Sequence, residues 1–128
     1  MKKIILSLVL IASSLFSLDG DTVYEKYCAS CHKMQKPKAG LLAPPMPSVS
    51  KRLQRDIDSK EEFVAFVKDY IQNPLEEKGH CSKKAFVNLG TMPPIGKSLT
   101  KEEIDAVSLW LFENFKHPKK IKSCDIND

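Results

Sequence analysis

Two cysteines and a histidine stand in the chain at the spacing that attaches a haem covalently. Cys28, Cys31 and His32 form a C-x-x-C-H motif, which is typical of c-type haem attachment. Residues three apart share one face of a helix, so both thiols can form thioethers with the two vinyl groups of one porphyrin. His32 lies four residues after Cys28 on that face. We therefore expect one haem c, with His32 as the proximal axial ligand of its iron and the other ring nitrogen held by a hydrogen-bond acceptor.

Two other interpretations of the cysteine pair are weaker. A thioredoxin-like redox motif requires the neighbouring strands of a βαβ unit, and no strand pattern lies nearby. A zinc site would recruit His80 and Cys81, but these residues are adjacent and lack the intervening residues of a usual second ligand pair. A disulfide or zinc domain without haem is therefore disfavoured.

The first eighteen residues have the pattern of a secretory signal peptide. Lys2 and Lys3 are followed by an uncharged, mainly apolar run up to Leu18, which is short for a membrane span. Cleavage is expected between residues 17 and 20, after Ser17 or after Gly20, and an uncleaved N-terminal anchor is the alternative. Because haem is attached to cysteines outside the cytoplasm in bacterial systems that resemble this one, we expect an exported, periplasmic protein.

Length and charge are those of one domain without a nucleic-acid partner. The 128 residues are 42% hydrophobic, which allows a single domain with a core. Removal of residues 1–20 lowers the net charge from +4 to +3, because Lys2, Lys3 and Asp19 are lost. The two carboxylates of a haem would nearly cancel this excess. No interleaving of aromatic and basic residues suggests binding to nucleic acid.

Caps and apolar periodicity predict helices separated by proline-rich or polar loops. Capping-box spacing is found in three pairs, namely Thr22 with Glu25, Ser59 with Glu62 and Thr100 with Glu103. The first helix is expected to carry the haem motif on its last turn or two. Further helices are predicted over residues 48–56, 59–72, 83–89 and from 100 to about 117, with loops over 33–47 and 75–82.

Two of these helices carry apolar side chains at helical spacing and are expected to form walls of the haem pocket. The side chains are Phe63, Val64, Phe66, Val67, Tyr70 and Ile71 in one helix and Ile104, Val107, Leu111, Phe112 and Phe115 in the other. Such a stripe more often belongs to a hydrophobic core than to a cofactor site. Around a haem the same side chains serve both, because a haem needs an apolar wall.

The residue on the other side of the iron decides between electron transfer and chemistry on a bound molecule. Outside the signal segment the candidates are Met34, Met46 and Met92. Met34 is too close to His32 to reach the opposite haem face, and Met46 lies between prolines in the loop expected on the proximal side. Met92 lies 60 residues after His32 and precedes two prolines that fix its backbone. We favour Met92 because of this distance and these prolines. A methionine at this place would fill the sixth position, and its soft, uncharged thioether would favour Fe(II). The alternative is a core methionine that fills a gap.

Taken together, these motifs resemble the class I monohaem c-type cytochromes of the bacterial periplasm. The resemblance covers about residues 20–116 and rests on the C-x-x-C-H motif, on T-M-P-P over residues 91–94 and on L-T-x-x-E over residues 99–103 before a final apolar helix. It implies an all-α small cytochrome c fold of four to five helices wrapped around one covalently bound haem. The N- and C-terminal helices cross in this family, which would bring Tyr24 near Leu111 or Phe112.

The resemblance also implies how the axial histidine is held. In this family a proline carbonyl soon after the motif accepts a hydrogen bond from the histidine, and Pro44 is the best match to that proline, with Pro45 as the close competitor. The bond would fix the tautomer of His32. Two features depart from the family pattern, namely Lys33, where relatives often have glycine, and the long segment over residues 71–89.

The expected boundaries are a signal peptide over residues 1–18, a cytochrome c domain over 19–116 and a charged C-terminal tail over 117–128. The tail contains Cys124, and in an oxidising compartment a disulfide between Cys81 and Cys124 is the economical interpretation. It would stabilise the fold by about 3 to 4 kcal/mol by constraining the unfolded chain. Free or intermolecularly paired thiols are the alternative.

The resemblance implies an electron-transfer protein rather than an enzyme. Such a protein would shuttle single electrons between respiratory redox partners, with a quinol-oxidising complex as the expected donor and a terminal oxidase or peroxidase as the expected acceptor. It would meet the membrane only through partner complexes or an uncleaved signal anchor. Lysines around an exposed haem edge would steer an acidic partner. The alternatives are a haem subunit fixed in a larger respiratory complex, and a haem peroxidase or gas sensor with a displaceable sixth ligand.

Overall fold

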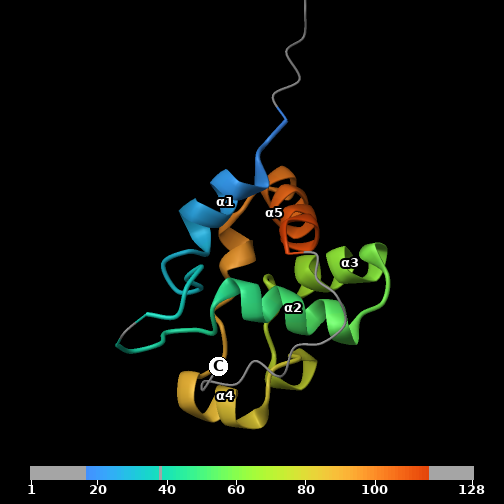
Figure 1. Cartoon of the computed structure of the whole chain (residues 1–128). Coiled ribbons are helices and arrows are strands. Elements are labelled where there is room, and N and C mark those ends of the chain that lie inside the picture. Colours follow the sequence, from blue (N-terminus) through green and yellow to red (C-terminus); the bar gives the residue numbers. More distant parts are fainter. Residues whose placement is uncertain (1–16, 38, 116–128) are drawn as a thin grey trace, which may run out of the picture.

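Five α-helices make up the computed structural model, which describes residues 17–37 and 39–115 (Figure 1). They are α1 (Gly20–Tyr27), α2 (Met46–Asp56), α3 (Lys60–Tyr70), α4 (Lys83–Leu89) and α5 (Lys101–Asn114), with short 3-10 turns at Glu76–Lys78 and Ile95–Ser98. No strand occurs within the described ranges. The predicted all-α fold of four to five helices is therefore confirmed.

The crossing of α1 and α5 is closed by a glycine. The two helices lie side by side in Figure 1. A Cβ atom on Gly20 would collide with the Cβ of Trp110 and would lie 2.5 Å from the carbonyl oxygen of Ala106. Beside this contact the ring of Tyr24, which is fully buried, stacks on the indole of Trp110 with centroids 5.0 Å apart. Glycine thus lets the two backbones approach closely enough for aromatic stacking.

Tyr24 and Leu111 belong to one buried cluster, as expected for the helix crossing. The ring that stacks on Tyr24 is that of Trp110, a residue that the expectation did not include. The ring of Phe112 packs edge-on against Phe63 of α3, with centroids 5.3 Å apart. Trp110 lies three residues after Val107 and so has helical spacing with the predicted stripe, although the stripe did not include it.

We expect Gly20→Ala to lower the free energy of unfolding by about 1 to 3 kcal/mol, because a methyl group inserted into a close backbone contact forces the helices apart. At an open helical position the same change would stabilise by up to about 1 kcal/mol. Urea denaturation of the purified protein measures the difference. Glu25→Ala, at an exposed position of α1, is the matched control and should change stability by less than about 0.5 kcal/mol. Equal stability of the Gly20→Ala protein and the unmodified protein would contradict the close contact.

The first helix begins earlier and ends earlier than predicted. Its N-cap is Asp19, whose carboxylate accepts hydrogen bonds from the backbone N–H of Asp21 at 3.2 Å and from the hydroxyl of Thr22 at 3.4 Å. The predicted capping box of Thr22 with Glu25 is therefore wrong. Because Asp19 caps the helix three residues upstream of Thr22, Gly20 lies inside α1 and reaches the crossing.

The haem motif follows α1 instead of lying on it. The helix ends at Tyr27 with Cys28 as its C-cap, so the prediction that the motif occupies the last turns of the helix is wrong. The carbonyl of Tyr24 accepts hydrogen bonds from the N–H groups of both Cys28 and Ala29, at 2.8 and 3.0 Å, which ends the regular helix. One further turn is closed by the N–H of His32, which donates to the carbonyl of Cys28 at 2.8 Å. The motif therefore keeps a local helical turn.

Caps at the later helices agree with their sequence signals. Thr100 and Glu103 form a reciprocal capping box at the start of α5, and Ser59 accepts a hydrogen bond from the N–H of Glu62 at 3.2 Å. The predicted helix over residues 83–89 has the bounds of α4, which ends at Gly90 with φ of +77°. Left-handed backbone of this kind favours glycine, so Gly90 is suited to end α4.

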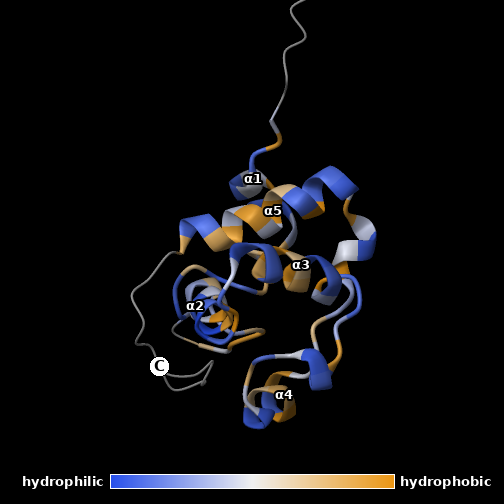
Figure 2. Ribbon diagram, turned by 90° about the vertical axis from the view of Figure 1, so that its right-hand side faces the viewer, coloured by the Kyte–Doolittle hydropathy of each residue, from blue (hydrophilic) through white to orange (hydrophobic). Residues whose placement is uncertain are grey.

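Contacts between α2, α3 and α5 build the rest of the core. In Figure 2 each of these helices carries both hydrophobic and hydrophilic residues, as expected of helices with one face in a core. From α2, the Ser50 hydroxyl donates to the carbonyl of Leu111 at 2.7 Å. The Gln54 amide donates to the carbonyls of Phe112 and Phe115, both at 3.1 Å. These bonds satisfy the carbonyl groups at the end of α5.

Several predictions fall on parts of the chain outside the described residues. These are the apolar run of the signal peptide up to residue 16, the charged tail over 117–128 and Cys124 as the disulfide partner of Cys81. The final helix ends at Asn114, earlier than the expected end near His117. Among the residues that are described, no helix has the length and hydrophobicity needed to cross a bilayer.

Candidate haem site

A large, mainly apolar cavity lies between the helices. The volume of this cavity is about 290 Å³. Its walls come from the 28–32 turn, the loop before α2, one side of α2 and α3, and the segment from α4 to Ile95. Phe66, Val67 and Tyr70 of α3 line it together with Ile71, the C-cap of that helix, and α5 adds Val107 and Leu111. Six of the predicted wall residues therefore face one cavity.

His32 lies in this cavity with one ring nitrogen already engaged. Its Nδ1 atom is 2.8 Å from the carbonyl oxygen of Pro44, so the Nδ1–H group donates and Nε2 keeps a lone pair. Burial lowers the pKa of His32 and the hydrogen bond to Pro44 opposes this only in part, which favours the neutral imidazole that a metal requires. The carbonyl of Pro45 instead accepts from Ser48 and Val49 at the start of α2.

The backbone of His32 is held by the core. The hydroxyl of Tyr24 donates to the carbonyl oxygen of His32 at 2.6 Å. Burial, with smaller contributions from nearby acidic groups, raises the pKa of Tyr24, so the phenol keeps its proton. The helix crossing and the histidine are thereby joined through one side chain.

We expect Tyr24→Phe to destabilise the protein by about 1 to 3 kcal/mol, because the buried carbonyl of His32 loses its donor without any change in shape. Thermal or urea unfolding measures this effect. Tyr27→Phe is a useful comparison, because the Tyr27 hydroxyl makes longer contacts of 3.2 and 3.4 Å to Glu103 and Glu103 keeps its hydrogen bond from Thr100. A Tyr24→Phe effect no larger than that of Tyr27→Phe would show that the contact to His32 is unimportant.

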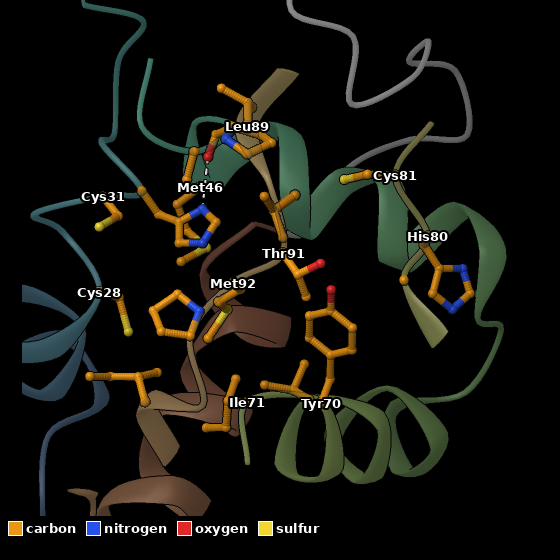
Figure 3. Close-up of a pocket in the computed structure, with 18 of the residues that line it drawn as sticks. Cys28, Cys31, Met46, Tyr70, Ile71, His80, Cys81, Leu89, Thr91 and Met92 are labelled. Atoms are coloured by element: carbon orange, nitrogen blue, oxygen red, sulfur yellow. Dashed lines mark hydrogen bonds between the residues drawn. The ribbon is translucent and has the colours of Figure 1, made fainter. Parts of the chain in front are cut away.

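The two motif cysteines line one side of the cavity. Cys28 is partly buried and Cys31 is exposed. Burial, together with the neighbouring Cys31, raises the pKa of the Cys28 thiol to about 11, so Cys28 is a protonated thiol at neutral pH. Figure 3 shows both sulfur atoms on the same side of the pocket.

The three candidate methionines differ in whether they line the cavity. Met34 packs against the core cluster and does not line the cavity, whereas Met46 and Met92 do. Met46 is only 4% exposed, and its N–H donates to the carbonyl of Lys33 at 2.9 Å, which ties it to the residue after His32. Met92 reaches the cavity from the segment between α4 and α5, far from the motif in sequence.

The segment that carries Met92 is fastened to the end of α3. The N–H of Gly96 donates to the carbonyl of Ile71 at 2.8 Å. A Cβ on Gly96 would lie 2.7 Å from Gln72 Cγ and 2.9 Å from the backbone carbon of Ile71, so only glycine allows this approach. With Pro93 and Pro94 limiting the backbone before it, the segment presents Met92 in a defined place.

Part of the site was not identified from the sequence. Val49, Arg52 and Leu53 of α2 line the cavity, although α2 was expected only as a short helix. Met46, Val49 and Leu53 recur at helical spacing, and this signal could have placed α2 against the site. His80 also lines the cavity. No pattern in the neighbouring sequence predicts this location.

The chemistry of these side chains fits a haem c. Apolar walls suit a porphyrin, two thiols can bond to its vinyl groups, and an imidazole and a thioether are both ligands of haem iron. In the described part of the chain no group of three or more His, Cys, Asp or Glu side chains could hold a metal ion.

Comparison with known proteins agrees with this chemistry. Residues 18–111 match the family described as "Cytochrome C oxidase, cbb3-type, subunit III". The chain is also 40% identical over 141 aligned residues to an uncharacterized protein of Aquifex aeolicus (strain VF5), an alignment that covers 94% of this chain and 92% of that protein. No solved structure matches the chain. With nearly three quarters of its length matched, the chain belongs to this cytochrome c family, whose domain implies covalently bound haem c and haem-based electron transfer.

Proposed function

We propose that the chain is a periplasmic electron carrier, with one haem c bonded to Cys28 and Cys31 and its iron held between His32 and Met92. One observation carries the proposal. The imidazole of His32, with Nδ1 engaged by Pro44, and the thioether of Met92 line the same cavity while approaching from distant parts of the chain.

Haem c, when bound, supplies reversible one-electron chemistry at iron. The protein's own residues set the conditions for it. The Pro44 carbonyl fixes the tautomer of His32 and raises its basicity. The neutral thioether of Met92 would favour Fe(II), and Met92 and His32 together would hold the iron without leaving a position for a substrate. The apolar walls from α3 and α5 keep water away from the iron.

The proposed address is the periplasm. Asp19 caps α1 and Gly20 packs at the helix crossing. These contacts favour cleavage after Ser17 over cleavage after Gly20, because the latter removes the cap and frees the crossing. We expect the exported protein to retain both residues, which N-terminal sequencing of the periplasmic fraction would show. An N-terminus at Asp21 would contradict this expectation.

The proposed partners are respiratory redox proteins, with a quinol-oxidising complex as donor and a terminal oxidase or peroxidase as acceptor. Exposed lysines near the site, among them Lys33, Lys36, Lys83 and Lys84, support docking to an acidic surface. The matching family's description favours a second candidate, a haem subunit fixed in an oxidase complex. Gel filtration separates the two, because a carrier elutes as a small protein and a subunit co-elutes with membrane components.

Potentiometric titration tests the function itself. A carrier gives one reversible one-electron transition and does not bind carbon monoxide, because both axial positions are filled. Turnover with hydrogen peroxide, or a carbon monoxide complex formed at neutral pH, would favour a peroxidase or gas sensor instead.

A further inference from the structure

The cavity has a polar end away from Cys28 and Cys31. Figure 3 shows Cys28 and Cys31 on one side, Tyr70 and His80 on the other, and Met92 between them. Arg52 of α2 also lines the cavity. Because the walls are otherwise mainly apolar, these polar side chains call for a polar part of the occupant.

Arg52 and His80 are held in place by one carboxylate. Asp56 Oδ2 accepts from Arg52 Nε at 3.0 Å and from His80 Nδ1 at 3.1 Å, and its Oδ1 accepts from Arg55 Nε at 3.1 Å. Burial raises the pKa of Asp56, but the hydrogen bonds from His80 and Arg55 and the charge of Arg52 lower it by more. The carboxylate is therefore ionised.

Arg52 and His80 are both partly shielded from solvent. The side chains of Arg52, Asp56 and His80 are only 22%, 25% and 27% exposed. Partial burial reduces screening by solvent, so Arg52 attracts an anion in the cavity more strongly than a fully exposed arginine would.

A haem carries its two carboxylates on the edge opposite its two vinyl groups. Since Cys28 and Cys31 take the vinyl edge in the proposed function, the carboxylates point to the other end of the cavity. We propose that Arg52 and His80 form the carboxylate-binding end of the haem site, with Asp56 as the residue that positions both. The inference rests on the proposed function. Arg52 bonds Asp56 through Nε, which leaves its terminal N–H groups for a carboxylate, and His80 bonds through Nδ1, which leaves Nε2.

The same assignment links Arg52 to the reduction potential. Fe(III) carries one more positive charge than Fe(II), so a positive group beside the haem disfavours the oxidised state and raises the potential. His80 is fixed at this end of the cavity by Asp56 of α2 and by the ring of Phe66 of α3, which packs edge-on against it with centroids 4.8 Å apart.

The first test compares two arginines that bond the same aspartate. Arg52 lines the cavity and Arg55 does not. In the haem-loaded protein, Arg52→Gln should lower the reduction potential and shift the propionate bending band in the resonance Raman spectrum. Arg55→Gln, which removes the same charge from the same cluster, should leave the band in place and lower the potential less. Equal effects of the two substitutions on both measurements would overturn the proposal.

The second test uses the histidines. The chain contains three, of which His32 is the proposed ligand and His117 lies in the tail. In the haem-loaded protein, His80→Gln should shift the propionate bending band in the resonance Raman spectrum, because His80 lines the cavity. His117→Gln should leave the band in place. A band that is unchanged in His80→Gln would contradict the role of His80.

These tests separate the inference from the function on which it rests. If the purified protein carries no covalent haem, or if its iron lacks a thioether ligand, the proposed function fails and the assignment falls with it. If haem and thioether ligation are intact in every variant, yet Arg52→Gln behaves as Arg55→Gln does, only the carboxylate-binding end is wrong.

Discussion

Replacing Cys28 and Cys31 together by alanine is expected to abolish covalent haem binding completely. The two thiols lie on the same side of a cavity that also contains His32 and Met92, and no thioether can form without them. A haem held only through its iron would dissociate on denaturation. The cavity would then lose its occupant, and the side chains around it would lose packing contacts. We therefore expect the double variant to be far less stable as well.

Haem staining after denaturing electrophoresis, together with the mass of the intact protein, measures this result. Cys81→Ala is the matched control, because Cys81 lines the same cavity and lies outside the C-x-x-C-H motif. It should retain haem in full. Each single variant, Cys28→Ala or Cys31→Ala, should keep one thioether and a reduced yield. Full haem staining in the double variant would contradict attachment through these residues.

Replacing Met92 by alanine is expected to open the sixth position of the iron. The thioether is lost, whereas the backbone of the segment stays in place, because Gly96 and the two prolines still fix it. The ferric protein should become high-spin or take up water, and the ferrous protein should bind carbon monoxide. The reduction potential should fall, because a neutral sulfur ligand that favours Fe(II) has been removed. Visible spectra with and without carbon monoxide measure these changes.

Met46→Leu and Met34→Leu are the controls for this substitution. Met46 lines the cavity and is buried, so Leu, of similar volume, should cost less than about 1.5 kcal/mol and leave the iron spectrum unchanged. Met34 lies outside the cavity lining and should also leave it unchanged. Loss of the sulfur-ligated spectrum in Met46→Leu, with the spectrum retained in Met92→Ala, would assign the sixth position to Met46.

Local signals predicted the later helices well. Ser82 and Gly90 bound α4, and Thr100 with Glu103 begins α5, because capping groups act within one turn of the backbone. The start of α1 was wrong for the same kind of reason. Asp19 and Thr22 are both good N-caps, and the choice between them depends on Gly20 reaching Trp110 across the chain. A contact between residues so far apart leaves no local pattern.

In the candidate site, too, local sequence patterns could be predicted and long-range contacts could not. The C-x-x-C-H motif and the proline-flanked Met92 could be singled out because the type and spacing of the residues are informative by themselves. Pro44 was named as the partner of His32 only through the family resemblance, and its carbonyl oxygen lies 2.8 Å from the histidine Nδ1 because of how the intervening loop folds. The meeting of Arg52 and His80 at Asp56 depends on where the segment before α4 crosses α2. Sequence spacing carries no information about such crossings, so these contacts required the fold.

The central claim is that His32 and Met92 hold the iron of one covalently attached haem. The visible spectrum of the unmodified protein, purified from the periplasm in oxidised and reduced forms, tests it most directly. We expect a sharp α-band on reduction and, in the oxidised protein, the weak long-wavelength band of sulfur-to-iron charge transfer. A high-spin oxidised spectrum without that band would contradict methionine ligation, and a purified protein without haem absorption would contradict the account as a whole.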